Sequence, residues 1–111
     1  MTEIRRYKKM SVPLTKAVFE QNLNSRFWLR DGDGERTQLD LVELKDGNAA
    51  PPREQFSLLF RGDKSRIHPQ NNYPMEHEVI GSFDLFLVPV NQNNEGTFYQ
   101  AVFNRLGTVT R

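Results

Sequence analysis

The sequence predicts a mainly β protein: a small antiparallel β-roll, barrel or sandwich of about six strands, with one short N-terminal helix. Two observations support this fold class. Short apolar segments follow one another at even spacing and are separated by turn-forming residues such as Asp31-Gly32-Asp33-Gly34. Only the segment after Thr15 repeats its apolar residues at helical spacing. Antiparallel strands joined by short turns, with one helix at an end or over an open face, account for both observations.

The predicted helix begins at Thr15, whose hydroxyl can accept a hydrogen bond from a free N–H group of the first turn. Val18, Phe19 and Leu23 then follow at helical spacing, and the residues between them are mostly polar. Asn22 to Ser25 end the helix.

Six strands are predicted after the helix, and the residues between them form turns and loops. The fourth strand alternates cleanly, with Tyr73, Met75, His77 and Val79 on its apolar side. Pro89 lacks an N–H group, so the end of the fifth strand is expected to be an edge or a bulge. The predicted strands are residues 26–29, 37–44, 55–61, 73–79, 82–90 and 98–103.

The fifth and sixth strands carry apolar side chains at both odd and even positions. Successive side chains of a strand point to opposite faces of the sheet, so both faces of these two strands are apolar. Each face must be covered by a second layer of the chain itself or by another molecule. On the fifth strand, one face carries Phe83, Leu85 and Leu87, and the other carries Phe86, Val88 and Val90.

Length and composition limit the possible classes of protein. The 111 residues predict one domain at 13–106, with an arm at 1–12 and a tail at 107–111. The absence of cysteine excludes disulfides and thiol catalysis, and two histidines are too few for a typical zinc site, so we expect neither metal nor cofactor. No apolar run reaches membrane-spanning length and no secretory signal is present, so we expect a cytoplasmic protein that is exported, if at all, as part of an assembly.

The first ten residues form a basic arm. They carry a net charge of +3, against −2 for the rest of the chain. The arm could contact a neighbouring protein, lie along phosphates with its tyrosine stacked on a base, or remain a solvated tail. The overall net charge of +1 does not indicate a nucleic-acid-binding domain. The arm residues that could contact a partner are Arg5, Arg6, Tyr7, Lys8 and Lys9.

His77 is the one candidate for acid–base chemistry. It could serve as a general base in a pocket with Tyr73 and Glu76 at its mouth. We favour a core histidine that is hydrogen-bonded to a neighbour, because no nucleophile lies at a recognisable spacing from it. We therefore predict no catalytic residues and no enzyme activity. His68 precedes a proline in the long polar loop 62–72 and is expected to be exposed to solvent.

Two short motifs have simple structural explanations. Asp31, Asp33 and Glu35 are spaced like the start of a calcium-binding EF-hand loop, but the later ligands of that loop are missing, so a hairpin turn explains them better. Arg61-Gly62-Asp63 spells a cell-adhesion tripeptide, but a turn at the end of a strand explains it without a receptor.

Several blocks resemble the bacterial domain-of-unknown-function family 6916. They are Phe56-Ser57-Leu58-Leu59-Phe60-Arg61-Gly62, then Glu76-His77 with Phe86-Leu87-Val88-Pro89-Val90, and Tyr99-Gln100-Ala101-Val102-Phe103-Asn104. The block Leu39-Asp40-Leu41-Val42-Glu43 and the helix entry from Leu14 are also similar. The resemblance covers residues 14–104 and implies an accessory or structural role in a phage-tail-like or surface assembly.

The expected function is therefore a non-enzymatic interaction module that assembles with itself or with a larger protein partner. Besides the arm, its candidate partner-binding residues are Phe86, Val88 and Phe98, and the sixth strand or an edge near Pro89 could pair with a partner strand. One alternative is a small-molecule-binding barrel or enzyme with a pocket near His77. A further alternative is nucleic-acid binding through the arm.

Overall fold

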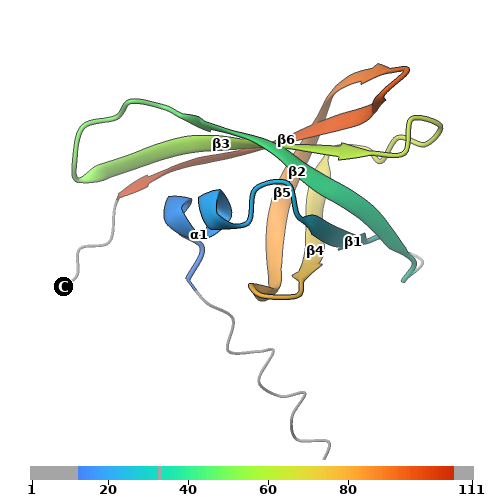
Figure 1. Ribbon diagram of the computed structural model, residues 1–111, viewed down its shortest axis with the longest axis horizontal. Helices are drawn as coiled ribbons and strands as arrows, with labels where there is room; N and C mark the ends of the chain where they lie inside the picture. The colour runs from blue at the N-terminus through green and yellow to red at the C-terminus, as the bar shows by residue number, and fades with distance from the viewer. Residues whose placement is uncertain (1–12, 33, 107–111) are drawn as a thin grey trace, which may run out of the picture.

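A computed structural model describes residues 13–32 and 34–106, which form a closed antiparallel β-barrel with one helix (Figure 1). The strand order around the barrel is β1-β2-β3-β6-β5-β4, and β4 pairs with β1 to close it. The predicted fold class of six antiparallel strands and one short helix is confirmed. The elements are α1 (Lys16–Gln21), β1 (Arg26–Arg30), β2 (Arg36–Asp46), β3 (Arg53–Gly62), β4 (Asn71–His77), β5 (Gly81–Asn93) and β6 (Gly96–Leu106).

The helix α1 begins as predicted. The Thr15 Oγ1 accepts a hydrogen bond from the Val18 N–H at 3.2 Å and so satisfies one of the free donors of the first turn. The helix ends at Gln21, directly before the segment Asn22 to Ser25 that was expected to end it, and Leu23 lies two residues beyond the helix with 38% of its surface exposed. The prediction that Leu23 shares the buried face of the helix is therefore wrong. Phe19 is the one fully buried residue of α1.

Phe19 is surrounded by aromatic rings from both sides of the barrel. Its ring centroid lies 6.4 Å from Phe27, 6.3 Å from Phe56, 6.2 Å from Phe83 and 5.6 Å from Phe103. Centroid distances of this size are typical of favourable aromatic pairs. The helix is thus attached to β1, β3, β5 and β6 through one side chain.

The apolar side of β4 ends earlier than the sequence predicts. Tyr73, Met75 and His77 point inward and are buried, but 66% of Val79 is exposed. The strand stops at His77 because the chain turns there, and the buried position beyond the turn is taken by Ile80. The expectation of an inward Val79 is wrong because a period of two does not continue through a turn.

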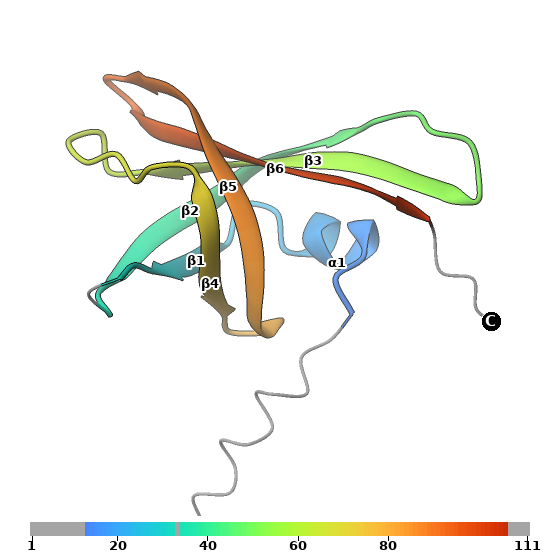
Figure 2. The ribbon, with the colours of Figure 1, turned by 180° about the vertical axis from the view of Figure 1, so that it is seen from behind.

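β5 changes its pairing partner between Leu87 and Val88. Residues 81–87 pair with β4, and the later residues pair with β6 up to Asn93 (Figure 2). The register shifts between Pro89 and Asn91, which confirms the irregularity predicted at this proline.

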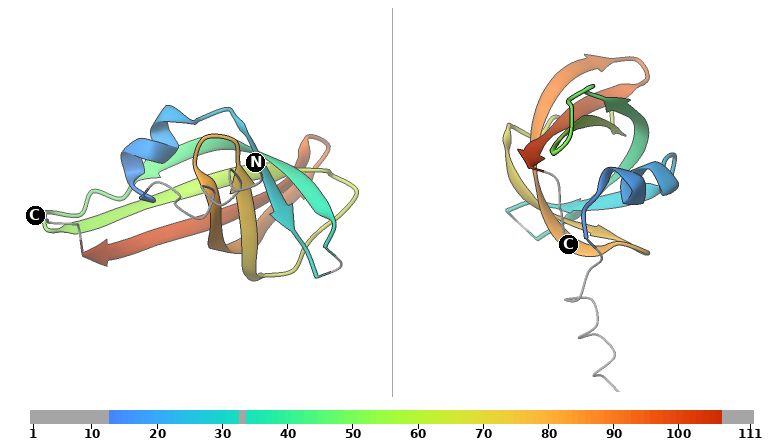
Figure 3. Two further views of the ribbon diagram at one scale, coloured as in Figure 1. Left: turned by 90° about the horizontal axis from the view of Figure 1, so that it is seen from below. Right: turned by 90° about the vertical axis from the view of Figure 1, so that its left-hand side faces the viewer.

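The strands β2, β3 and β6 extend beyond the closed part of the barrel as a three-stranded ribbon. β6 pairs with β3 from Thr97 to Leu106, but with β5 only up to Gln100. In the view from below, β6 forms one margin of this ribbon, and α1 lies near the opposite margin (Figure 3). The strand β6 therefore has one unpaired edge from Ala101 to Leu106 within the described part of the chain.

We expect the substitution Phe19→Ala to lower the free energy of unfolding by about 3–5 kcal/mol, because it leaves a cavity between four aromatic rings. Urea unfolding measures the change. The matched control is Glu20→Ala at the neighbouring exposed position, which should change the stability by less than about 0.5 kcal/mol. Equal effects of the two substitutions would show that Phe19 does not anchor the helix.

Candidate functional site

The outer side of β5 is an open apolar surface. Phe86 is 51% exposed and Val90 is 49% exposed, whereas Leu85 and Leu87 are buried in the core and Phe83 packs against it. Val88 is half-buried between them. The described chain therefore packs against the inner face of β5 and leaves its outer face exposed to solvent.

The outer side of β6 continues this apolar surface. Val102 is 62% exposed and Leu106 is 68% exposed, and Asn104 lies between them on the same side of the strand. Phe98, at the start of β6, is half-buried and lies opposite Arg61 of β3, so it offers less apolar area than Val102 or Leu106. The sequence pointed to Phe98 and not to these two residues, because the predicted sixth strand ended at residue 103 and no residue on its exposed side was assigned.

The two apolar rows are joined across the sheet at Gln100. In the register of the strands, Gln100 lies between Leu59 of β3 and Val88 of β5. Beyond this point β5 and β6 separate, so Val102, Asn104 and Leu106 lie on the outer surface of the ribbon. We call the exposed residues Phe86, Val90, Val102 and Leu106, together with the unpaired edge of β6, the open surface.

The inner side of the β6 end is fixed by Arg105. Its Nε donates to the Glu54 Oε1 at 3.0 Å, and an Nη2–H of Arg105 donates to the backbone oxygen of Leu14. The guanidinium also lies 4.9 Å from the ring centroid of Phe103, a favourable cation–π contact. The charge of Arg105 is thus neutralised within its own chain, and the end of β6 is held straight beside β3.

Both ring nitrogens of His77 are hydrogen-bonded within the chain. Its Nδ1 accepts hydrogen bonds from the backbone N–H groups of Val79 at 3.0 Å and Ile80 at 3.2 Å, so the proton of the neutral ring lies on Nε2. The Nε2–H donates to the Ser25 Oγ at 2.8 Å, and the Ser25 hydroxyl donates to the Asn22 oxygen at 2.5 Å. Burial lowers the pKa of His77. The imidazole holds the turn after β4 to the segment between α1 and β1.

A groove of about 620 Å³ lies on the outer side of the barrel near His77. Glu76 crosses it, with one carboxylate oxygen 2.8 Å from the Arg30 Nε and the other 3.3 Å from the Arg36 Nε. The guanidinium of Arg36 lies 4.5 Å from the ring centroid of Trp28. The groove is lined by Trp28, Arg30, Arg36, Glu76, His77, Glu78, Gly81 and Ser82.

Only two of the three predicted pocket residues meet in this groove. His77 and Glu76 line it, but Tyr73 points into the barrel and donates its hydroxyl proton to the Pro69 oxygen at 2.5 Å. Tyr73 and His77 lie four residues apart on the inner side of β4, whereas Glu76 lies on the outer side. A pocket mouth that uses all three side chains is therefore not formed.

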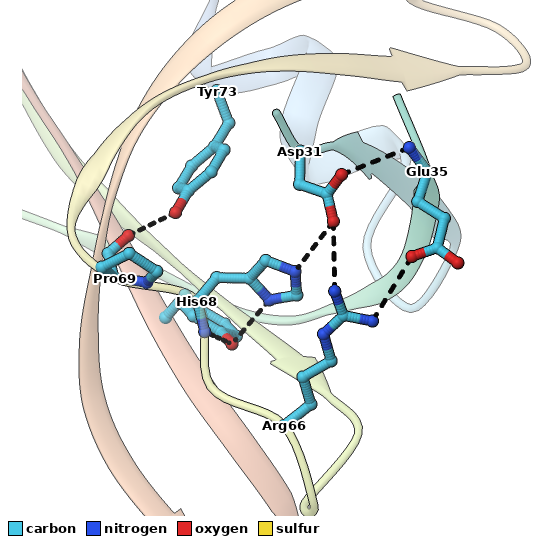
Figure 4. A network of polar contacts seen from close by, with 7 residues as sticks. Asp31, Glu35, Arg66, His68, Pro69 and Tyr73 are labelled. Carbon is cyan, nitrogen blue, oxygen red and sulfur yellow. Dashed lines mark hydrogen bonds and ion pairs between the residues drawn. The ribbon is translucent and has the colours of Figure 1, made fainter. Parts of the chain in front are cut away.

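His68 is buried, with only 5% of its surface exposed, so the expectation of a solvent-exposed loop histidine is wrong. Its backbone N–H donates to the Tyr99 Oη at 2.9 Å, and its Nδ1 lies 3.4 Å from the same oxygen. Its Nε2 lies 3.8 Å from the Asp31 Oδ2, which also accepts a hydrogen bond from Arg66 at 3.2 Å (Figure 4). A polar loop gives no periodicity from which the burial of one residue could be read.

Burial favours the neutral forms of His68, Tyr73 and Tyr99. Burial lowers the pKa of His68, Arg66 lowers it further, and Asp31 opposes both effects. Burial likewise raises the pKa of Tyr99 and of Tyr73. The cluster joins the loop between β3 and β4 to the β1–β2 turn and to β6.

The short motifs have the structural roles expected of them. In the turn between Asp31 and Glu35, the Gly34 N–H donates to the backbone oxygen of Asp31 at 2.9 Å. Gly34 has a φ of +82°, a conformation that favours glycine. Asp33 lies outside the described residues. The Arg61 guanidinium lies 3.7 Å from the Asp40 carboxylate, and the Asp63 carboxylate accepts hydrogen bonds from Ser65.

Three further points concern the chain ends, metal binding and the membrane. The arm residues Arg5, Arg6, Tyr7, Lys8 and Lys9, and the tail 107–111, lie outside the described residues. Among residues 13–32 and 34–106, no group of three or more metal-ligating side chains is close enough to hold an ion. The described helix is too short to cross a membrane.

The fold and the surface define a class of protein: a small, closed six-stranded antiparallel β-barrel with a helix at its open end. Within that class, the chain belongs to the family described as a domain of unknown function, DUF6916, whose model matches residues 14–103. The match covers α1 and nearly all of the barrel, and it confirms the resemblance drawn from the sequence. No curated protein and no solved structure matches the chain.

We expect the free energy of unfolding to fall as the pH is lowered from 7.5 to 5. The pKa of both histidines is lowered in the fold, so the unfolded state binds more protons below its own histidine pKa of about 6.5. The stabilisation is complete above that value and is lost as the pH falls toward the folded pKa. Each histidine contributes a slope of at most about 1.4 kcal/mol per pH unit.

Urea unfolding at several pH values measures this slope, and the variants His68→Gln and His77→Gln separate the two contributions. Comparison with the unmodified chain cancels the titration of the carboxylates. Each variant should show a shallower dependence on pH between 5 and 7.5. An unchanged slope in either variant would mean that the corresponding imidazole titrates alike in the folded and unfolded states.

Proposed function

We propose that this domain is a non-enzymatic interaction module, which assembles with itself or with a larger protein partner through the open surface. The observation that carries the proposal is the unpaired edge of β6 from Ala101 to Leu106. Within this segment, the side chains of Val102 and Leu106 are both more than 60% exposed. A partner strand would complete the backbone hydrogen bonds of this edge, and its side chains would cover the exposed apolar ones.

The chemistry of the edge supports a protein partner. Proteins that remain monomeric usually protect a free edge with charged side chains. The opposite margin of the ribbon follows this rule, because β2 carries Glu43, Lys45 and Asp46 there. The exposed positions of β6 instead carry Val102, Asn104 and Leu106, which have no charge.

The positions of the two histidines support a role without catalysis. The ring nitrogens of His77 are engaged by Ser25 and by the turn after β4, and His68 is covered by its own loop. A general base must reach the proton that it abstracts. The family resemblance further suggests that the assembly is of the phage-tail-like or surface kind, and this part of the proposal rests on the resemblance alone.

A library of displayed peptides tests the proposal. We expect the immobilised domain to select extended peptides with alternating apolar residues, which bind along β6. The substitution Val102→Asp should weaken the binding of the selected peptides on the order of tenfold or more, because it places a charge against apolar side chains. Fluorescence anisotropy of labelled peptides measures the effect.

The matched control for this test is Gln38→Asp, an exposed position on β2 that is remote from the β6 edge. It should leave peptide binding unchanged. Selected peptides that bind Val102→Asp as tightly as the unmodified domain would show that β6 is not the binding edge.

The groove near His77 supports a second candidate function, the binding of a small anionic molecule. Two guanidinium groups, those of Arg30 and Arg36, share the single carboxylate of Glu76 in a space of about 620 Å³, and Trp28 provides an aromatic wall. Guanidinium groups bind carboxylates and phosphates well. The exposed carboxylate of Glu78 at the same groove reduces its attraction for anions, so we rank this candidate second.

Trp28 is the only tryptophan of the chain, so its fluorescence reports on this groove alone. If the second candidate is correct, benzoate or inorganic phosphate should change the Trp28 emission with saturation, and Arg36→Gln should abolish the change. Thr37→Ser is the control, since it leaves the charges of the groove unaltered. An emission that stays constant to high ligand concentration would exclude binding of these two anions.

A further inference from the structure

The unpaired edge of β6 is complementary to itself. An antiparallel pair of identical strands has a twofold axis, and the residue on that axis lies opposite its own copy. If Asn104 occupies the axis, Val102 of one chain lies opposite Leu106 of the other. Directly opposite side chains in an antiparallel pair are close enough to stabilise each other when both are apolar.

We infer that the partner of this surface is a second copy of the same chain, paired through antiparallel β6 strands centred on Asn104. This inference rests on the proposed function and adds the identity of the partner and the register. The two ribbons then form one continuous sheet with the order β2-β3-β6 in one copy followed by β6-β3-β2 in the other.

The inner side of the strand fits the same register. Phe103 lies opposite Arg105 of the second copy, and the two Arg105 side chains are offset from each other along the strands. Within one chain, the Arg105 guanidinium already lies 4.9 Å from the Phe103 ring and is neutralised by Glu54 at 3.0 Å. The pairing therefore repeats a favourable contact between the chains and brings no unpaired charge to the axis.

Asn104 suits the axis position. Its Oδ1 accepts a hydrogen bond from the Arg53 Nη1 at 2.7 Å, so the oxygen has a partner in its own chain. Its side-chain amide is free to donate toward the second copy with its two N–H bonds. The axis is thus polar, and it is flanked on both sides by an apolar Val–Leu pair.

Other registers fit worse. A shift of one residue places the outward Asn104 of one chain opposite the inward Phe103 of the other. The outer face of one ribbon would then continue into the inner face of the other. An axis at Phe103 places Val102 opposite Asn104, and an axis at Arg105 places Leu106 opposite Asn104. Among the central positions of the edge, only an axis at Asn104 places the outward apolar residues Val102 and Leu106 opposite each other.

Pairing through this edge closes on itself and does not form a fibre. A twofold contact uses the same surface in both chains and leaves no second copy of that surface exposed. The outer margins of the joint sheet would be the two β2 strands, whose Glu43, Lys45 and Asp46 discourage further pairing.

Cysteine cross-linking tests the register, because the chain has no cysteine of its own. The Cα atoms of opposite residues in an antiparallel pair lie about 4.5–5.5 Å apart, which is within the range that a disulfide spans. Asn104→Cys should therefore form a disulfide-linked dimer under mild oxidation. Gln100→Cys is the control: it is on the same side of the same strand, but its two copies would lie about 26 Å apart.

A second pair of variants tests the pairing away from the axis. Val102→Cys and Leu106→Cys should each form no disulfide-linked dimer alone, and the two variants should cross-link to each other when mixed. Light scattering of the full unmodified chain should give twice the monomer mass, and Val102→Asp should return it to the monomer. Circular dichroism of each variant confirms that the barrel is folded.

A monomeric mass at all concentrations, or equal cross-linking of Asn104→Cys and Gln100→Cys, would overturn the inference. Either result leaves the proposed function intact if peptides still bind the domain and Val102→Asp still weakens them. Loss of both self-association and peptide binding would overturn the two proposals together.

Discussion

The burial of Phe19 is the interaction on which the rest of the structure depends. β5 and β6 stop pairing at Gln100, so the barrel is closed at one end and open at the other. Phe19 fills the open end, where it lies between Phe83 of β5 and Phe103 of β6. A single apolar side chain on a two-turn helix thereby fills the space between the two strands, and it keeps water out of the core.

The separation of β5 and β6 also explains where the polar groups lie. Once the strands part, the edge of β6 has no strand beside it, and its apolar side chains remain on the surface. Figure 1 shows the loop between β3 and β4 on the side of the barrel away from α1. This loop carries His68 inward, where its backbone N–H donates to the Tyr99 hydroxyl. One end is thus sealed by an aromatic helix and the other by a hydrogen-bonded loop.

The sequence predicted those features that depend on neighbouring residues. Short apolar segments separated by turn-forming residues identified the six strands, Thr15 marked the start of the helix, and Pro89 marked the bulge. Features that depend on distant residues were not predictable. The burial of His68 requires Tyr99 and Asp31, and the exposure of Val102 and Leu106 requires knowledge that β5 has turned away from β6. In the candidate surface, Phe86 and Val88 were therefore found, and the residues at the end of β6 were missed.

The exposed side chains at the end of β6 can change during evolution without changing the fold. The side chains of Val102, Asn104 and Leu106 lie outside the core, so replacing them would cost little folding free energy. The Phe19 cluster and the His77 turn tolerate far less change, because each position there is in contact with several others. Binding preference and foldability are thus encoded by separate residues, and descendants of one barrel could acquire different associates without losing their shared architecture.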